Sequence, residues 1–503
     1  MNIIKKFSVL AAGCALSLTL ASCNNNNTNT TESTSTDSST ETVQTSPDDG
    51  SKKVLKYVDI GTPPKDIAKV NDKINEYLDK EDAGYHMELS FWDWGDYEQK
   101  LQLASNTGED FDLAFAASWA GPYATMAEKG AFLDITDLIK DKPNITDKLT
   151  DDVIKGASIG GKLYGVPGAA ENVVAGDYFV WNKQFVDKYD IPYKEVKSLK
   201  DLEPYLKEVQ EKEATVEYPL AVANDWGIVT TPTPQNVVVS GISVTEKDGK
   251  LTVENQFADP EYKEEVDVMK DYMDKGFISP DAPQAEAGQK YAGDSWLVTK
   301  AEGDPGSNGI WKGSFGTEVV SYPIGENVLI SNDKVQGKLV CINSQTENQE
   351  EALDFIDRMF SSEELQNILC YGIEGEHYNI EDGKIARTDN YMNYDVPAFT
   401  FISAYTQTPL KDQIAKGDPE YDEGIKDYKE KLTPSPLLGF TLDRTDIDSE
   451  IINIEQIYSE YKKNIQTGAF DDAYYEEFLK RLDDAGIQKV IEETQKQIDE
   501  WNK

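Results

Sequence analysis

Strand-type runs alternate with amphipathic helices through most of this chain, and this alternation limits the fold more than any other feature. Residues 87–91 and 111–115 have the apolar pattern of strands, and Asp96 begins a capping-box pattern that predicts a helix between them. Residues 178–181 repeat the strand pattern, and a long helix is expected over about 346–369. Such alternation is typical of parallel-sheet α/β domains, so we predict an α/β fold.

The size of the chain predicts more than one domain. It has 503 residues, and the part that follows a polar N-terminal segment, roughly 450 residues, is too long for one hydrophobic core. A hydrophobic content of 39%, with 8 Trp and 26 Tyr, excludes wholesale disorder. Two long C-terminal helices are expected to pack onto the body, since apolar residues recur at helical spacing at Ile451, Ile454, Ile457, Tyr461 and Ile465, and again at Ile487, Val490, Ile491, Thr494, Ile498 and Trp501.

The N-terminus has the features of a secretory signal peptide. Lys5 and Lys6 precede an apolar run over residues 7–21 that ends in small residues, so residues 1–22 are predicted to be a cleaved signal. The tetrapeptide Leu20-Ala-Ser-Cys23 resembles the lipobox of bacterial lipoproteins, which implies that Cys23 is lipid-modified. The alternative, a transmembrane helix, would need a longer apolar run.

Residues 23–53 are predicted to be a disordered tether. After residues 24–27, which are all Asn, the segment is rich in Thr, Ser, Asp and Glu and nearly without apolar side chains. Such a composition buries too little surface to offset chain entropy. We expect the tether to hold a folded body away from the membrane.

The net charge and the cysteines narrow the function. A formal charge of −43 makes nucleic acid and anionic lipid headgroups poor partners. Besides Cys14, in the signal, and Cys23, the chain has only Cys341 and Cys370. These two could form a disulfide in an oxidising compartment or remain as two buried free thiols, and the sequence leaves both alternatives open.

No catalytic residue, metal site or cofactor is predicted. The only histidines are His86 and His377, so neither a zinc-binding cluster nor a Ser-His-Asp triad is indicated. A glycosidase needs only two suitably spaced carboxyl groups, and 92 acidic residues leave that alternative open.

Several segments together resemble the extracellular solute-binding lipoproteins of ABC importers, the maltose-binding-protein-like family. The resemblance rests on their order behind the lipobox, at residues 91–97, 111–115, 118–123, 162–167, 178–183, 350–355 and 371–378. The C-terminal helices resemble a subgroup with an extra uncharacterised C-terminal domain.

This resemblance implies a two-lobe fold with a hinge and an interlobe cleft, plus C-terminal helices. One lobe is expected to comprise residues 54–167 and 334–371. The other is expected to comprise residues 168–333 and 372–503, including a helical extension over about 435–503. A solute would bind between the lobes, which then close by hinge motion.

The resemblance also implies a set of ligand-binding residues, since sugar-binding members stack aromatic rings on sugars and use carboxylates and amides for hydroxyl groups. Each of these side chains could instead be core or solvated surface, and Glu374 and Tyr378 could be hinge residues. The set is Trp92, Trp94, Trp119, Tyr123, Glu171, Asn172, Trp226, Trp296, Asp304, Asn308, Trp311, Glu374 and Tyr378.

The function implied is that of a monomeric binding protein, lipid-anchored on the extracellular face of a bacterial cell membrane. It would deliver a carbohydrate, expected to be an oligosaccharide, to the permease subunits of an ABC transporter. The alternatives are a peptide or cationic solute, or a surface glycoside hydrolase. A purely adhesive lipoprotein would predict internal repeats, and no repeat is visible.

Overall fold

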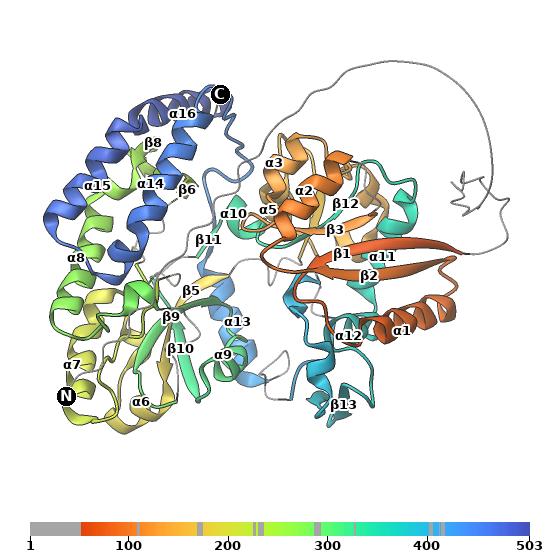
Figure 1. The fold of residues 1–503 in the computed structure, drawn as a ribbon, viewed down its shortest axis with the longest axis horizontal. Coiled ribbons are helices and arrows are strands. Elements are labelled where there is room, and N and C mark those ends of the chain that lie inside the picture. The colour runs from red at the N-terminus through yellow and green to blue at the C-terminus, as the bar shows by residue number, and fades with distance from the viewer. Residues whose placement is uncertain are drawn as a thin grey trace, which may run out of the picture. The chain divides into compact units, whose positions relative to one another are not determined.

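The computed structural model describes residues 52–107, 111–168, 175–224, 228–229, 236–285, 293–325, 328–401, 406–411, 413 and 418–502. The predicted signal peptide, Cys23 and nearly all of the predicted tether lie outside these residues. Residues 52–503 form one compact unit (Figure 1). Within the described ranges, no helix combines the length and the apolar character needed to cross a membrane.

A five-stranded sheet, in the order β2-β1-β3-β12-β4, forms the centre of the first lobe. β1 is parallel to both β2 and β3, as the strand–helix alternation predicts, whereas β12 is antiparallel to its neighbours β3 and β4. The strands are β1 (Lys53–Ile60), β2 (Tyr85–Trp92), β3 (Leu113–Ala116), β4 (Gly165–Pro167) and β12 (Leu339–Ile342).

Helices pack against this sheet in one hydrophobic core. The expected helix over 346–369 is in fact two helices, because the Ser362 hydroxyl accepts the Leu365 N–H and caps a new helix at that point. The helices are α1 (Ile67–Lys80), α2 (Tyr97–Thr107), α3 (Tyr123–Glu128), α4 (Pro143–Thr146), α5 (Asp151–Ala157), α10 (Asn332–Val335), α11 (Gln349–Ser361) and α12 (Glu363–Tyr371).

The second lobe contains a three-stranded sheet in the order β10-β5-β9. The expected parallel arrangement is not found here, because β9 and β10 lie on opposite edges of β5 and both run antiparallel to it. The elements are β5 (Gly176–Asn182), α6 (Lys183–Tyr189), α7 (Glu203–Lys212), α8 (Pro260–Asp274), β9 (Val298–Gly303), α9 (Asn308–Phe315) and β10 (Val319–Pro323).

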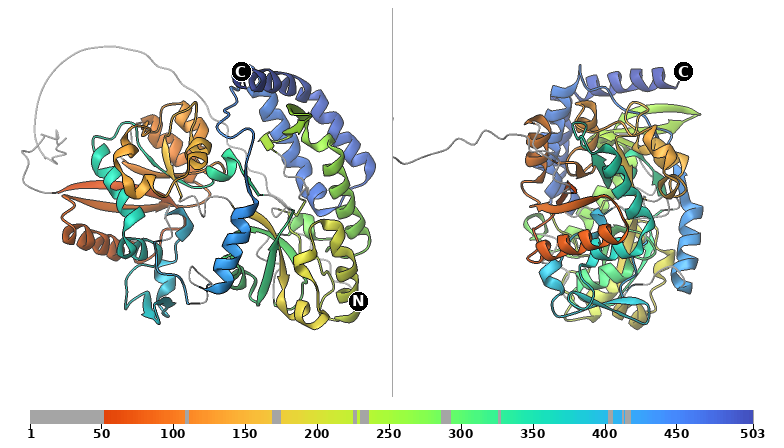
Figure 2. Two further views of the ribbon diagram at one scale, coloured as in Figure 1. Left: turned by 180° about the vertical axis from the view of Figure 1, so that it is seen from behind. Right: turned by 90° about the vertical axis from the view of Figure 1, so that its right-hand side faces the viewer.

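The C-terminal helices form a third core with a β-meander and α8. Figures 1 and 2 show the helices beside the strands of this meander. Both predicted helical faces are largely buried, and a further helix, α15, lies between them in the chain. The elements are β6 (Asn236–Val239), β7 (Ile242–Lys247), β8 (Lys250–Asn255), α14 (Asp448–Thr467), α15 (Asp472–Asp484) and α16 (Ile487–Trp501).

Described residues between 373 and 408 pack against the first lobe. Tyr394 and Phe401 belong to its core, and Asn367 of α12 bonds the Thr408 N–H through its side-chain oxygen. We therefore propose that the first lobe includes the described residues up to Thr408 rather than ending at Tyr371. The remaining elements are β11 (Val328–Ile330), β13 (Tyr378–Glu381), β14 (Lys384–Arg387), α13 (Pro419–Lys431) and β15 (Leu432–Pro434).

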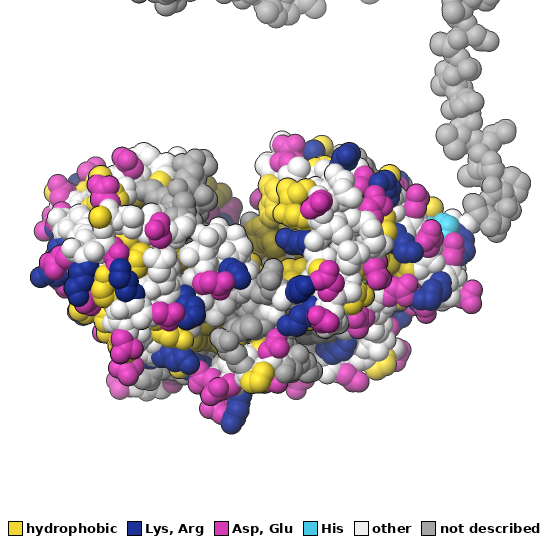
Figure 3. Space-filling model, turned by 90° about the horizontal axis from the view of Figure 1, so that it is seen from below, with side chains coloured by type: hydrophobic (Ala, Val, Ile, Leu, Met, Phe, Trp, Pro, Cys, Tyr) yellow, Lys and Arg dark blue, Asp and Glu magenta, His cyan; other side chains and the backbone are white. Residues whose placement is uncertain are grey.

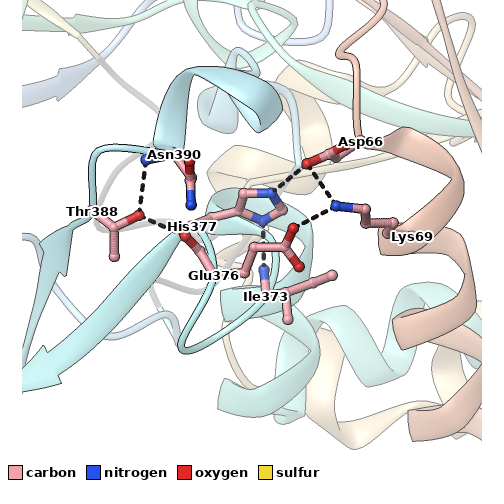
Figure 4. Close-up of polar contacts among 7 residues, drawn as sticks. All are labelled: Asp66, Lys69, Ile373, Glu376, His377, Thr388 and Asn390. Carbon is pink, nitrogen blue, oxygen red and sulfur yellow. Dashed lines mark hydrogen bonds and ion pairs between the residues drawn. The ribbon is translucent and has the colours of Figure 1, made fainter.

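A buried histidine fixes the turn that follows α12 (Figure 4). His377 Nδ1 accepts the Ile373 backbone N–H at 3.0 Å, so in the neutral ring the proton is on Nε2. Nε2 lies 3.3 Å from Asp66 Oδ2 and donates to it. The ring also stacks on Tyr394, at 5.9 Å between centroids. This clamp ties residues 373–377 to the start of α1.

The same cluster has the spacing of a metal site but is already satisfied by protein groups. Donor atoms of Asp66, Glu376 and His377 lie within 4.8 Å of one another. However, the Lys69 ammonium forms ion pairs with both carboxylates, and the proton on His377 Nε2 removes its lone pair from coordination. The geometry thus favours a structural clamp over a metal centre.

Replacing Gly372 by Ala should destabilise the protein strongly. Gly372 has φ +84°, and an added Cβ would lie 2.4 Å from His377 Nδ1. We expect a loss of roughly 3 kcal/mol or more, from backbone strain together with overpacking. Gly375 is the matched control, because it has φ +82° but no heavy atom near an added Cβ. Gly375→Ala should cost only about 1–2 kcal/mol in urea unfolding, and equal losses would contradict the clamp.

The stability should fall as the pH rises from about 4.5 to 7 because of a buried acid in α8. Glu265 is 3% exposed, and burial raises the pKa of its carboxyl from 4.5 to about 7. In this window the folded state therefore binds more protons than the unfolded state, so deprotonation costs stability. Glu265→Gln should lose less stability between pH 5 and pH 8 than the wild type, by about 1–3 kcal/mol in urea unfolding. Parallel pH profiles would exclude this role.

Candidate functional site

The carboxyl ends of three parallel strands define one edge of the first-lobe sheet. β1 ends at Ile60, β2 at Trp92 and β3 at Ala116, and the turns that follow all emerge at this edge. Ligands of open α/β sheets bind outside the carboxyl ends of the strands. The side chains that follow these strand ends are therefore the first candidates for a binding site.

Three exposed aromatic rings lie side by side at this edge, and we call Trp94, Trp119 and Phe399 the aromatic platform. Their side chains are 46%, 51% and 49% exposed. The two indoles are stacked with centroids 6.3 Å apart and planes at 22°, and Phe399 lies 6.2 Å from Trp119. Exposed aromatic side chains in contact with one another present a continuous apolar surface to a flat ligand face.

Trp119, the central ring, is held in place by two kinds of contact. Its indole N–H donates to the Gly337 carbonyl at 2.7 Å, and its ring lies 5.7 Å from the buried Phe115. The neighbouring Ser118 N–H donates to the Gln336 carbonyl at 2.8 Å. Residues 336–337 lead into β12, so the crossing back from the second lobe orients this ring. A ring that is fixed before binding loses little entropy when a ligand arrives.

Phe399 was missed by the sequence reasoning. It lies in a 3₁₀ turn, Ala398–Thr400, whose residues follow Trp94 by about three hundred positions in the chain. A single Phe two residues after a Pro carries no signal of binding. Only its contact with Trp119 makes Phe399 a candidate, and no sequence pattern predicts that contact.

Polar groups surround the aromatic platform. Thr62, Asp93 and Ser118 are exposed at the same strand ends, and Thr62 Oγ1 donates to Asp93 Oδ2 at 3.3 Å. Carboxylate and hydroxyl groups beside aromatic rings can bond the hydroxyl groups of a polar ligand while the rings stack on its faces. In Figure 3, hydrophobic side chains gather beside a hollow, amid interspersed acidic and basic groups.

The other predicted residues of the first lobe lie deeper. Trp92 is half-buried and packs on Tyr97, with ring centroids 6.1 Å apart. Tyr123 is fully buried, donates its hydroxyl proton to the Ala157 carbonyl and accepts the Tyr164 N–H. The structure therefore gives Tyr123 an internal bracing role in this conformation.

The predicted residues between 293 and 316 are not exposed as a group. Trp296 and Trp311 are 1% and 6% exposed, and Trp311 packs on Tyr178 at 5.5 Å. Asp304 Oδ1 accepts the Gly306 N–H, and Asn308 Oδ1 accepts the Ser321 hydroxyl. These four residues thus build the start and packing of α9.

The remaining predictions fall in two places. Glu374 is exposed and lies in the turn that the His377 clamp holds, whereas Tyr378, directly after that turn, is 4% exposed and its ring lies 6.0 Å from that of Tyr371. Glu171, Asn172 and Trp226 lie outside the described residues.

A set of charged residues lies where the chain returns to the first lobe. The Lys334 ammonium pairs with Glu302 at 2.6 Å, and Lys300 pairs with Asp177 at 3.2 Å. Burial opposes the charge of Lys334, but Glu302 and Asp177 outweigh it and raise its pKa. Lys334 precedes β12 and Glu302 lies in β9, so this ion pair links the two lobes. It was also absent from the sequence predictions.

The comparison with protein families covers most of the chain. Residues 74–373, more than half of the chain, match the family described as bacterial extracellular solute-binding protein. Residues 436–503 match a domain of unknown function, DUF3502.

Individual relatives agree with this assignment. A carbohydrate ABC transporter substrate-binding protein of Streptococcus pneumoniae serotype 4 (strain ATCC BAA-334 / TIGR4) is 28% identical over 91% of this chain and 92% of its own. The crystal structure of the N-glycan transport solute-binding protein NgtS from Streptococcus pneumoniae superposes with a TM-score of 0.78 at 26% identity, covering 89% of this chain and 99% of that one. NgtS in complex with Man5GlcNAc gives 0.68 at 26% identity, over 90% and 98%.

The two sheets with their helices, the crossing segments between them and the agreement over nearly the whole of these relatives lead to one conclusion. The chain belongs to the bacterial extracellular solute-binding proteins.

Proposed function

We propose that this protein is the lipid-anchored extracellular receptor of an ABC importer for an oligosaccharide. The observation that carries the proposal is the aromatic platform at the carboxyl edge of the first-lobe sheet. Successive centroid separations of 6.3 and 6.2 Å present three rings in series to a ligand. A chain of sugar rings, with apolar faces and hydroxyl edges, matches rings flanked by Thr62, Asp93 and Ser118 better than a small solute does.

The relatives support the same ligand class. The names of two of them refer to carbohydrate and to N-glycan transport, and NgtS crystallised with Man1GlcNAc and with Man5GlcNAc. The TM-score is 0.78 for the NgtS structure without a ligand in its title and 0.72 and 0.68 for the two complexes. A rearrangement of the lobes on binding would lower the score in this order.

Hinge closure would convert two half-sites into one. In the open form a solute meets only the platform on the first lobe. The second lobe would then cover it, exclude water and present a joint surface to the permease subunits. The Lys334–Glu302 ion pair lies at the crossing between the lobes, so it would respond to this motion. Closure costs free energy, so only a fraction of the molecules is closed before the solute binds. The apparent affinity equals the affinity of the closed form multiplied by that fraction.

A binding panel tests the proposal. Residues 24–503 would be titrated in a calorimeter with mono- and oligosaccharides that contain mannose or N-acetylglucosamine, with peptides and polyamines alongside. Binding of an oligosaccharide without its consumption supports the receptor. Binding only of a peptide or polyamine would favour the acidic-surface alternative, and disappearance of the glycan would favour the hydrolase.

Trp119→Ala should weaken oligosaccharide binding about 10- to 30-fold, because the loss of a central aromatic anchor costs roughly 1.5–2 kcal/mol. Trp501→Ala in α16 is the matched control, since Trp501 is 39% exposed but packs on Phe440 of the C-terminal region. It should leave the affinity within about twofold. Equal effects of the two substitutions would reject the platform as the binding surface.

Loss of the proposed lipid anchor should change the location of the protein. Cys23→Ser should release the protein from the membrane fraction into the medium of a bacterial host, because the tether has no other apolar anchor. The measurement is detergent phase partitioning and incorporation of a palmitate analogue, with Cys14→Ser as the control. Retention of label in the Cys23→Ser protein would contradict the assignment.

A further inference from the structure

A buried carboxyl group lies near the end of β1, in contact with the turn that carries Phe399. Asp59 is 0% exposed, and its Oδ1 accepts the Ile60 N–H at 2.7 Å. Its Oδ2 lies 2.9 Å from Thr400 Oγ1. Thr400 is the residue after Phe399, so this contact joins the sheet to the turn that carries the third ring.

The proton count at Thr400 indicates the ionisation state of Asp59. The Thr400 hydroxyl lies within hydrogen-bond distance of both Asp59 Oδ2 and the Pro397 carbonyl, at 2.9 and 2.8 Å. The hydroxyl has one proton, and a carbonyl only accepts. Both contacts are satisfied only if Asp59 is neutral, so that the carboxyl donates to Thr400 and Thr400 donates to Pro397. An ionised Asp59 leaves one contact without a proton.

Among the described residues, apolar packing anchors the turn on both sides of Phe399. Pro397 packs on Gly61, where an added Cβ would lie 3.0 Å from the proline ring. Phe401 is 1% exposed and meets Tyr57 and Phe91 edge-on at 6.2 Å each. Thr400 is the polar link between these two apolar anchors, and the exposed Phe399 lies directly beside it.

We propose that Asp59 in its neutral form is a positioning residue for ligand binding, because through Thr400 it holds Phe399 against Trp119. This inference rests on the proposed function, in which Phe399 is part of the platform. It adds a residue that does not contact the solute, and it makes the position of the Phe399 ring depend on the protonation of Asp59.

The environment of Asp59 supports a proton on it near neutral pH. Burial raises the pKa of Asp59 from 3.8 to about 7, and its contacts with Thr400 and with the Ile60 N–H oppose this only in part. Other titratable groups that sense its charge are Tyr97, Tyr394 and Cys370, and burial raises the pKa of each. Since ionisation of Asp59 draws the Thr400 proton to the carboxylate and leaves the Thr400–Pro397 contact without one, the turn that carries Phe399 should loosen as the pH rises through about 7.

The test compares variants at pH 6 and pH 8 with Man5GlcNAc, a neutral oligosaccharide, as the first probe. Wild-type affinity should fall at pH 8, by at most tenfold for each unit by which binding shifts the pKa of Asp59. The affinity of Asp59→Asn should be the same at pH 6 and pH 8, because its amide donates to Thr400 at any pH. Thr400→Val should be weaker at both values, and Thr400→Ser should restore the wild-type profile.

Glu265→Gln is the matched control, because it also removes a buried acid with a raised pKa, but one in α8 of the second lobe. It should keep the wild-type pH dependence of affinity. A flat profile in Glu265→Gln, or a pH-dependent one in Asp59→Asn, would overturn the inference. In a Phe399→Ala background, Asp59→Asn should have no further effect.

A readout without ligand separates this inference from the proposed function. Hydrogen exchange of the Thr400 amide, which bonds the Pro397 carbonyl at 2.9 Å, reports on the turn directly. At pH 8 it should exchange faster in the wild type than in Asp59→Asn, and at pH 6 the two should match. If this difference in exchange is seen but no glycan binds, the receptor function is rejected and the positioning role of Asp59 is retained. If glycan binds but the two proteins exchange equally at pH 8, only the positioning role of Asp59 is rejected.

Discussion

The antiparallel insertion of β12 between β3 and β4 is the interaction on which the rest of the structure depends. All four of its residues, from Leu339 to Ile342, are 0% exposed. β12 pairs with both β3 and β4, although the second lobe lies between these two strands and β12 in the sequence. The approach is close, because a Cβ on Gly165 would lie 2.7 Å from the Cys341 sulfur. Without β12, β3 and β4 would each lose their shared partner.

The same insertion orients the candidate site. The residues just before β12 accept the backbone N–H of Ser118 and the indole N–H of Trp119. The crossing from the second lobe therefore completes the sheet and fixes the central ring of the platform at once. The Lys334–Glu302 ion pair lies at that crossing. A change in the relation between the lobes would thus reach the aromatic platform through covalently adjacent residues.

Local patterns predicted the elements well and the burial of individual side chains poorly. β2, α2 and β3 follow from alternation and capping, which depend on neighbours in the sequence. Ser362 before two glutamates was also a usable signal for the break between α11 and α12. Trp119 and Trp296 look alike in sequence, yet one is 51% and the other 1% exposed, because packing by distant segments decides.

Only part of the proposed site could be predicted from the sequence, for the same reason. Trp94 and Trp119 follow strand ends, where a sheet-edge rule applies. Phe399 and the packing of residues 373–408 on the first lobe depend on contacts between segments hundreds of residues apart. Without an observed contact, no periodicity or composition connects Thr400 to Asp59.

The two cysteines of the folded body are both free and both buried, which resolves the open alternative in favour of thiols. Burial raises the pKa of the Cys370 thiol to about 12 and that of Cys341 as well, so neither supplies a reactive thiolate at neutral pH. A protein made without residues 1–23 would therefore accept fluorescent dyes selectively at cysteines introduced on each lobe. Its native core thus makes it suited to single-molecule distance measurements of lobe movement.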